Sequence, residues 1–115
     1  MEQRGNTVDF VEAQIIRFVE LMRPPIDIRA QLDIGYSYEK QVLILVEIRP
    51  KWDNPKEIME IPFAKARYVK SRHIWNIYWM RASGKWDPYQ PHAQANSLEE
   101  FFSVVDEDAY GCFKG

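Results

Sequence analysis

The fold is decided by residues 61–86, IPFAKARYVKSRHIWNIYWMRASGKW. Alternating side chains before and after the short polar break Ser71-Arg72 predict two antiparallel strands, over 58–69 and 73–82. Pro62 predicts a bulge or an edge position, because proline has no N–H to donate to a central ladder. The later strand is apolar on both sides, which is typical of a strand that is covered twice or that meets a partner.

Two further strands precede this stretch. Alternating apolar residues predict one over 28–36, and the aliphatic run QVLILVEIR predicts another over 41–49. The break at 38–41 is short enough for a hairpin, although it lacks an Asn-Gly or Asp-Gly pair and leaves the turn type open. We expect the core to lie on the side that carries Leu32, Ile34, Val42, Ile44, Val46 and Ile48, with Leu43 and Leu45 on the other side.

A helix is predicted over 8–22, where apolar residues recur at helical spacing. Asn6 or Thr7 can cap it, and Asp9 in the first turn suits the positive end of the helix dipole. The pair at 24–25 is Pro-Pro, which ends the helix because proline supplies no backbone donor.

A second helix is predicted over 98–106, after a proline-rich loop over 87–96. Ser97 and Glu100 have the spacing of a capping box. The predicted order is αββββα in a single domain, 1–115. The fold class is α+β, a four-stranded antiparallel meander with both helices packed on one face.

Charge is distributed unevenly along the 115 residues, although the net charge is only -2. Residues 61–86 hold six basic and no acidic residues, whereas 87–115 hold one basic and six acidic residues.

The single Cys112 allows no internal disulfide and favours a reducing compartment. Neither a signal peptide nor a long apolar span is apparent, so we expect a cytoplasmic protein without membrane contact.

Four phrases of the sequence together resemble a known family. They are EIRPKWDNP at 47–55, WNIYWMRASGKW at 75–86, SLEEFFSVVDED at 97–108 and AYGCF at 109–113. They resemble a family of short bacterial proteins, some carried on mobile gene cassettes, that is classified only as a domain of unknown function, number three thousand and twenty-four. The resemblance implies a compact single domain and carries over no catalytic role.

One enzymatic hypothesis rests on Asp33, Glu47 and Arg49. An Asp followed on the next strand by Glu-x-Arg is similar to the carboxylate site of restriction-type nucleases, where acidic oxygens hold a divalent metal. Against this, arginine is a poor substitute for a catalytic lysine, and the three residues also suit cross-strand charge pairs. Two histidines without a cysteine pair, and no phosphate-binding glycine pattern, predict neither a metal site nor a cofactor.

The stronger hypothesis is a binding module that uses the basic, aromatic stretch. Alternation places Lys65 and Arg67 on one face of their strand and Tyr68 on the other. Cations interleaved with rings suit single-stranded nucleic acid or another anionic partner. The candidate binding residues are Lys65, Arg67, Tyr68, Trp75, Tyr78, Trp79, Arg81, Lys85 and Trp86. Three alternatives stay open: the rings fill the core beside solvated cations, the chain is a protein-interaction domain, or it forms a homodimer through surplus apolar surface.

Overall fold

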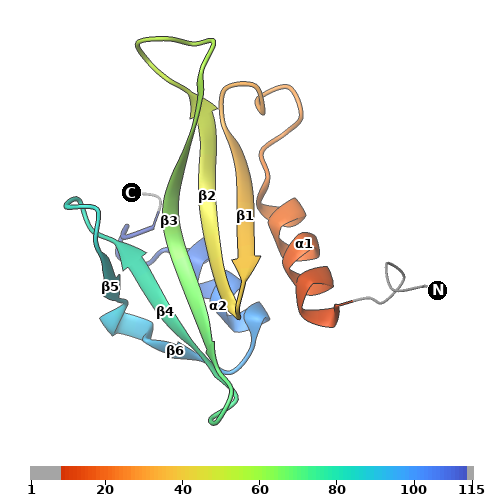
Figure 1. Ribbon diagram of the computed structural model, residues 1–115, viewed down its shortest axis with the longest axis vertical. Coiled ribbons are helices and arrows are strands. Elements are labelled where there is room, and N and C mark those ends of the chain that lie inside the picture. Colours follow the sequence, from red (N-terminus) through yellow and green to blue (C-terminus); the bar gives the residue numbers. More distant parts are fainter. Residues whose placement is uncertain (1–8, 114–115) are drawn as a thin grey trace.

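A six-stranded antiparallel sheet and two α-helices make up residues 9–113, the part of the chain that the computed structural model describes (Figure 1). The elements are α1 (Phe10–Met22), β1 (Asp33–Glu39), β2 (Val42–Pro50), β3 (Ile58–Val69), β4 (Ile74–Met80), β5 (Trp86–Pro88), the 3-10 turn η2 (Gln90–His92), β6 (Gln94–Ala95) and α2 (Leu98–Glu107). Strands β1 to β5 are neighbours in chain order, and β6 pairs with β4. The α+β class and the antiparallel meander are confirmed.

The predicted loop over 87–96 contains two short strands, so the prediction of four strands was too low. Both pair with the same edge of β4, where Tyr78 lies opposite Pro88 and Trp75 opposite Ala95. Between them, Ile77 donates to the carbonyl of Ala93 and accepts from the N–H of Tyr89, each at 2.9 Å. Prolines divide the segment into short pieces, which explains why the sequence pattern resembles a loop.

The segment before β1 is a series of turns, and the strand predicted from residue 28 begins only at Asp33. The N–H groups of Ile28 and Gln31 bond the carbonyls three residues earlier, at 2.9 and 2.8 Å. These local bonds replace the ladder that an extended strand would need. The apolar alternation over 28–32 was therefore misleading.

Both helices begin where capping residues satisfy their first amides. Asp9 is the N-cap of α1, where its carboxylate accepts from the N–H groups of Val11 and Glu12, whereas we had expected it inside the first turn. Asn6 and Thr7 lie outside the described residues.

The N-cap of α2 is Ser97. Its hydroxyl accepts from the N–H of Glu100 at 3.1 Å, as the capping box predicts. The Glu100 carboxylate reaches back one residue further than expected, to the N–H of Asn96.

The β1–β2 hairpin decides which side of β2 is buried. Its turn is the pair Lys40-Gln41, both with positive φ (51° and 66°), as a type I′ turn requires. A turn of two residues places Ile34 opposite Glu47 and Tyr36 opposite Leu45. Even-numbered side chains of β1 therefore share a face with odd-numbered side chains of β2.

The predicted core face of β2 was consequently wrong. Leu43 and Leu45 are fully buried in the core, while Val42, Ile44, Val46 and Ile48 lie half-buried on the other face of the sheet. The two rows are equally aliphatic, so hydrophobicity alone did not distinguish them.

The bulge predicted at Pro62 is confirmed. Leu45 pairs with Ala64 and Val46 with Pro62, which leaves Phe63 as the extra residue on β3.

Both helices pack on the face of the sheet that carries Ile34, Leu43 and Leu45, as predicted for the layer arrangement. The rings of Phe18 on α1 and Phe102 on α2 stack at 5.0 Å and join the helices above this core. The hydroxyl of Tyr36 donates to the Glu12 carboxylate at 2.8 Å and ties α1 to the edge strand β1. We call this side the covered face. No described element covers the opposite side, the open face.

Candidate functional site

The strand register aligns the candidate residues of the open face in rows across the sheet. One row runs from Ile44 on β2 through Lys65 on β3 and Tyr78 on β4 to Pro88 on β5. The next row contains Val42, Arg67 and Asn76. Directly opposite residues of antiparallel strands project on the same side. The sequence prediction that Lys65 and Arg67 share a face is therefore confirmed by the register.

Two rings flank Lys65 on this face. Its Nζ atom lies 4.6 Å from the centroid of the Tyr78 ring and 5.1 Å from that of the Trp86 ring. A cation over aromatic faces is attracted by about 0.5–1 kcal/mol at an exposed site. Neither Lys65 nor exposed Arg67 forms an ion pair with any residue in 9–113. We define Lys65, Arg67, Tyr78 and Trp86 as the cationic-aromatic cluster.

Three of the candidate rings belong to the covered face and do not join this cluster. Trp75 is 6% exposed, and the ring centroid of Tyr68 lies 5.0 Å from it. Trp79 lies opposite Ala64, whose side chain is fully buried, and packs against the same core. The hypothesis that some of the rings fill the core describes these three, whereas Tyr78 and Trp86 remain on the open face.

Arg81 and Lys85 lie at the β4–β5 turn, next to Trp86. The backbone N–H of Arg81 donates to the carbonyl of Lys85 at 2.9 Å, which closes the turn. The Arg81 guanidinium lies 3.9 Å from the Asp87 carboxylate, at the outer limit of an ion pair. Both side chains are exposed. Asp87 lies opposite Trp79 of the covered face, so its ion pair with Arg81 lies on that side of the sheet, and the expectation that Arg81 joins Lys65 and Arg67 was wrong.

The residues of the nuclease hypothesis are separated by the sheet. Asp33 lies opposite Ile48, whereas Glu47 lies opposite Ile34, so the two carboxylates project from opposite faces. Glu47 forms its ion pair with Arg49 at 3.0 Å. Among the described residues, no group of three acidic, histidine or cysteine side chains is arranged to hold a metal ion.

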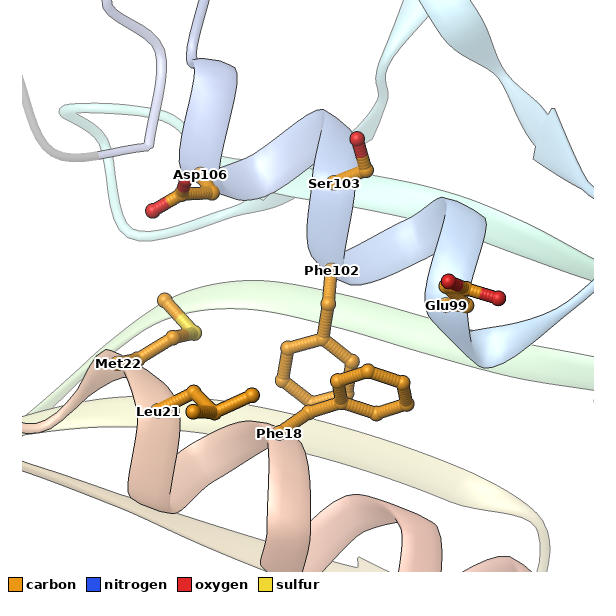
Figure 2. Close-up of a pocket in the computed structure, with 7 residues that line it drawn as sticks. All are labelled: Phe18, Leu21, Met22, Glu99, Phe102, Ser103 and Asp106. Carbon is orange, nitrogen blue, oxygen red and sulfur yellow. The ribbon is translucent and has the colours of Figure 1, made fainter.

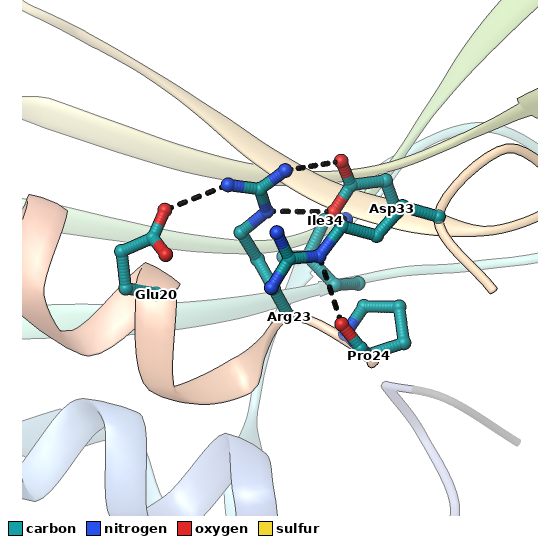
Figure 3. Close-up of polar contacts among 6 residues, drawn as sticks. Glu20, Arg23, Pro24, Asp33 and Ile34 are labelled. Atoms are coloured by element: carbon teal, nitrogen blue, oxygen red, sulfur yellow. Dashed lines mark hydrogen bonds and ion pairs between the residues drawn. The ribbon is translucent and has the colours of Figure 1, made fainter. Parts of the chain in front are cut away.

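Asp33 instead anchors the segment that follows α1 (Figure 3). The Arg23 guanidinium donates two bonds of 2.9 Å to its two carboxylate oxygens, and a third donor nitrogen of Arg23 reaches Glu20 at 2.8 Å. The bonds from Arg23 hold the pKa of Asp33 below its ordinary value of 3.8, aided by the N–H of Ile34. This two-point pairing identifies Asp33 as a structural contact between α1 and β1.

Sequence patterns missed a groove between the two helices (Figure 2). It measures about 240 Å³, with an apolar wall of Phe18, Leu21, Met22 and Phe102 and a polar rim of Glu99, Ser103 and Asp106. Leu21 is 75% exposed, although it belongs to α1. From the sequence, Leu21 looks like an ordinary apolar residue of an amphipathic helix. Its exposure, which marks the groove, can be recognised only once the structure shows which face of α1 is buried.

The fold and the cluster together define an α+β domain whose meander is covered by helices on one face and open on the other. The family model for a domain of unknown function (DUF3024) matches residues 5–115, and the chain belongs to this family. This confirms the resemblance drawn from the four phrases. Neither curated proteins nor solved structures gave a significant match. None of the described helices is long and apolar enough to cross a membrane.

Proposed function

We propose that this protein is a binding domain, not an enzyme, and that its open face binds an anionic partner, with single-stranded nucleic acid as the first candidate. One observation carries the proposal: Lys65 and Arg67, which lack ion pairs within residues 9–113, lie beside the rings of Tyr78 and Trp86 on the uncovered side of the sheet. We further propose a cytoplasmic location, which the unpaired Cys112 supports.

The cluster supplies the two interactions that single strands need. Bases stack on aromatic side chains with about 1–3 kcal/mol per base, and this contact tolerates any base. Lys65 is already beside both rings, so a base on Tyr78 or Trp86 brings its phosphate close to a cation. Arg67, one row away, continues the path for a phosphate backbone on this face. Arg81 and Lys85 add exposed positive charge at the neighbouring turn.

The first test removes the two cations of the cluster together. Lys65→Ala with Arg67→Ala should weaken binding of a fluorescein-labelled oligothymidylate and reduce the slope of log K against log salt by about 1–2 units, because each phosphate contact releases roughly one counterion. Fluorescence anisotropy over a salt series measures both quantities. Lys56→Ala, at an exposed position in the β2–β3 loop, is the matched control and should change neither. An unchanged slope in the double variant contradicts the proposal.

A second test addresses stacking. Tyr78→Ala should weaken oligothymidylate binding about tenfold at every salt concentration, because a lost stack costs roughly 1–3 kcal/mol and releases no counterion. Tyr110→Ala removes a ring that is 71% exposed and lies outside the sheet, so its affinity should equal that of the unmodified chain. Equal losses in both variants would show that the open face is not the binding surface.

The nuclease hypothesis predicts different sensitive residues. Asp33→Ala and Glu47→Ala should leave strand binding nearly unchanged if the open cluster is the site, since neither carboxylate belongs to it. Incubation of labelled DNA with magnesium ions provides the opposing measurement. Cleavage that Asp33→Ala abolishes would make the binding-domain proposal wrong.

Self-association is a second candidate, favoured by the aliphatic row on β2. Val42, Ile44, Val46 and Ile48 lie half-buried on the open face, next to Pro62 on β3. Contiguous apolar surface of this kind usually meets protein, and a homodimer is the simplest such assembly. Sedimentation should show a dimer that Val46→Lys dissociates. A monomer at every concentration up to the millimolar range would remove this candidate.

A further inference from the structure

A second pocket lies on the covered side of the sheet, away from the cationic-aromatic cluster. It has a volume of about 370 Å³ and is formed where the first turns of α1 and α2 meet the ends of β1 to β4. Ligand sites commonly measure about 300–1,000 Å³, so the pocket is large enough for a small organic molecule. Its principal lining residues are Gln14, Tyr38, Gln41, Tyr68, Trp75 and Asn96.

The lining combines aromatic rings with side-chain amides and includes His73. Three rings, Tyr38, Tyr68 and Trp75, come from three different strands. The side-chain amides of Gln14, Gln41 and Asn96 bond no other residue of 9–113. Each amide offers donors and an acceptor side by side. No carboxylate, lysine or arginine is among the described residues that line the pocket.

The wall at the β3–β4 turn is fixed in place by its own contacts. The hydroxyl of Tyr68 and Nδ1 of His73 are 3.1 Å apart and hydrogen-bonded. His73 has φ 54°, a left-handed conformation that costs energy for a residue other than glycine. The Tyr68 ring packs at 5.0 Å against that of Trp75, which is itself buried. The aromatic surface is therefore oriented before any ligand enters.

From this pocket we infer a site for a nucleobase, a planar nitrogen heterocycle with a hydrogen-bonding edge. The half-buried rings of Tyr38 and Tyr68 provide a surface for stacking. Side-chain amides pair well with base edges that present a donor beside an acceptor. The absence of carboxylate, lysine and arginine side chains among the described lining residues suits an uncharged ring. The inference goes beyond the proposed function and uses none of the cluster residues. The base comes either from a free nucleoside or from a nucleotide strand that reaches around the sheet.

The experiment uses adenosine, which carries no phosphate, and the full chain labelled with ¹⁵N. Titration should shift the side-chain amide signals of Gln14, Gln41 and Asn96 and the indole N–H signal of Trp75, saturably and with little dependence on salt. Gln14→Ala and Asn96→Ala should each lower the affinity about two- to tenfold, the effect of one lost hydrogen bond. Both positions are exposed, so the fold should tolerate the changes. Gln90→Ala, an exposed glutamine outside the pocket, is the control and should leave the affinity unchanged.

Two results would overturn the inference: no shift of these signals at millimolar adenosine, or tighter binding of methyl α-glucoside than of adenosine at the same signals. Competition with oligoadenylate identifies the source of the base, since displacement of adenosine supports a strand and its failure supports a free nucleoside. The variant with Lys65→Ala and Arg67→Ala should still bind adenosine normally. Loss of strand binding and loss of adenosine binding are therefore measured separately, so either proposal can fail alone.

Discussion

The two faces of the sheet have nearly the same aliphatic content on β2 and opposite surroundings. On the covered face, Leu43 and Leu45 are fully buried beneath the helices. On the open face, the neighbouring Val42, Ile44 and Val46 remain half-buried. The difference shows that burial in this protein depends on where α1 and α2 pack, and not on which row of the strand is more apolar.

The same comparison explains where binding surface is available. Rings on the covered face, such as Trp75, contribute to the core beneath α2 and to the wall of a pocket. On the open face no helix of residues 9–113 lies above the rings, and Tyr78 and Trp86 instead flank Lys65. The attraction of a cation to ring faces does not neutralise its charge, because it involves no acidic partner.

The largest expected effect comes from truncating adjacent residues on the two faces. Leu45→Ala should lower the free energy of unfolding by about 2–5 kcal/mol, because it removes a fully buried side chain and leaves a cavity. Ile44→Ala should cost only about 1 kcal/mol, because its side chain is partly solvated in the folded state. Urea unfolding measures both. Equal losses would mean that the open face is buried in solution, which would favour the homodimer.

A smaller effect is expected at the helix that closes the covered face. Ser97→Ala removes the acceptor for the N–H of Glu100 and should cost about 1 kcal/mol, the usual value for an N-cap. Ser103→Ala is the matched control, since Ser103 is exposed within the same helix and should change stability by less than about 0.5 kcal/mol. Thermal unfolding followed by circular dichroism distinguishes the two. A control loss as large as that of Ser97→Ala would contradict the capping role.

The smallest effect concerns the contact between α1 and the edge strand, and it depends on pH. The bonds from Arg23 lower the pKa of Asp33 below 3.8 in the folded state, so ionised Asp33 stabilises the fold above about pH 4. This stabilisation is lost as the pH falls through the folded pKa. Asp33→Asn should be less stable than the unmodified chain at neutral pH, and the two should converge in acid.

Acid unfolding followed by tryptophan fluorescence tests this dependence on pH. Asp53→Asn, an exposed position in the β2–β3 loop, should follow the curve of the unmodified chain. A constant difference between Asp33→Asn and the unmodified chain from neutral pH to strong acid would show that the pair does not titrate as the geometry implies. It would also weaken the assignment of Asp33 as the structural anchor of α1.

The sequence alone determined the elements that local periodicity and caps specify. The bounds of β3, 58–69, match the prediction, and those of both helices differ by at most two residues. Pro62 marked the bulge because it lacks an N–H. Alternation also placed Lys65 and Arg67 together, so half of the cationic-aromatic cluster followed from one strand. Each of these features depends on residues close together in the chain.

Only the tertiary structure decided which face each row occupies. The choice between Leu45 and Val46 depends on the even length of the turn at 40–41 and on the helices that pack from both ends of the chain. The separation of Asp33 from Glu47, the split of the aromatic rings between two faces and the pocket beside Trp75 all follow from that choice. The physical reason is that a strand with two apolar rows has two nearly equivalent ways to be buried. Contacts between distant segments select one of them.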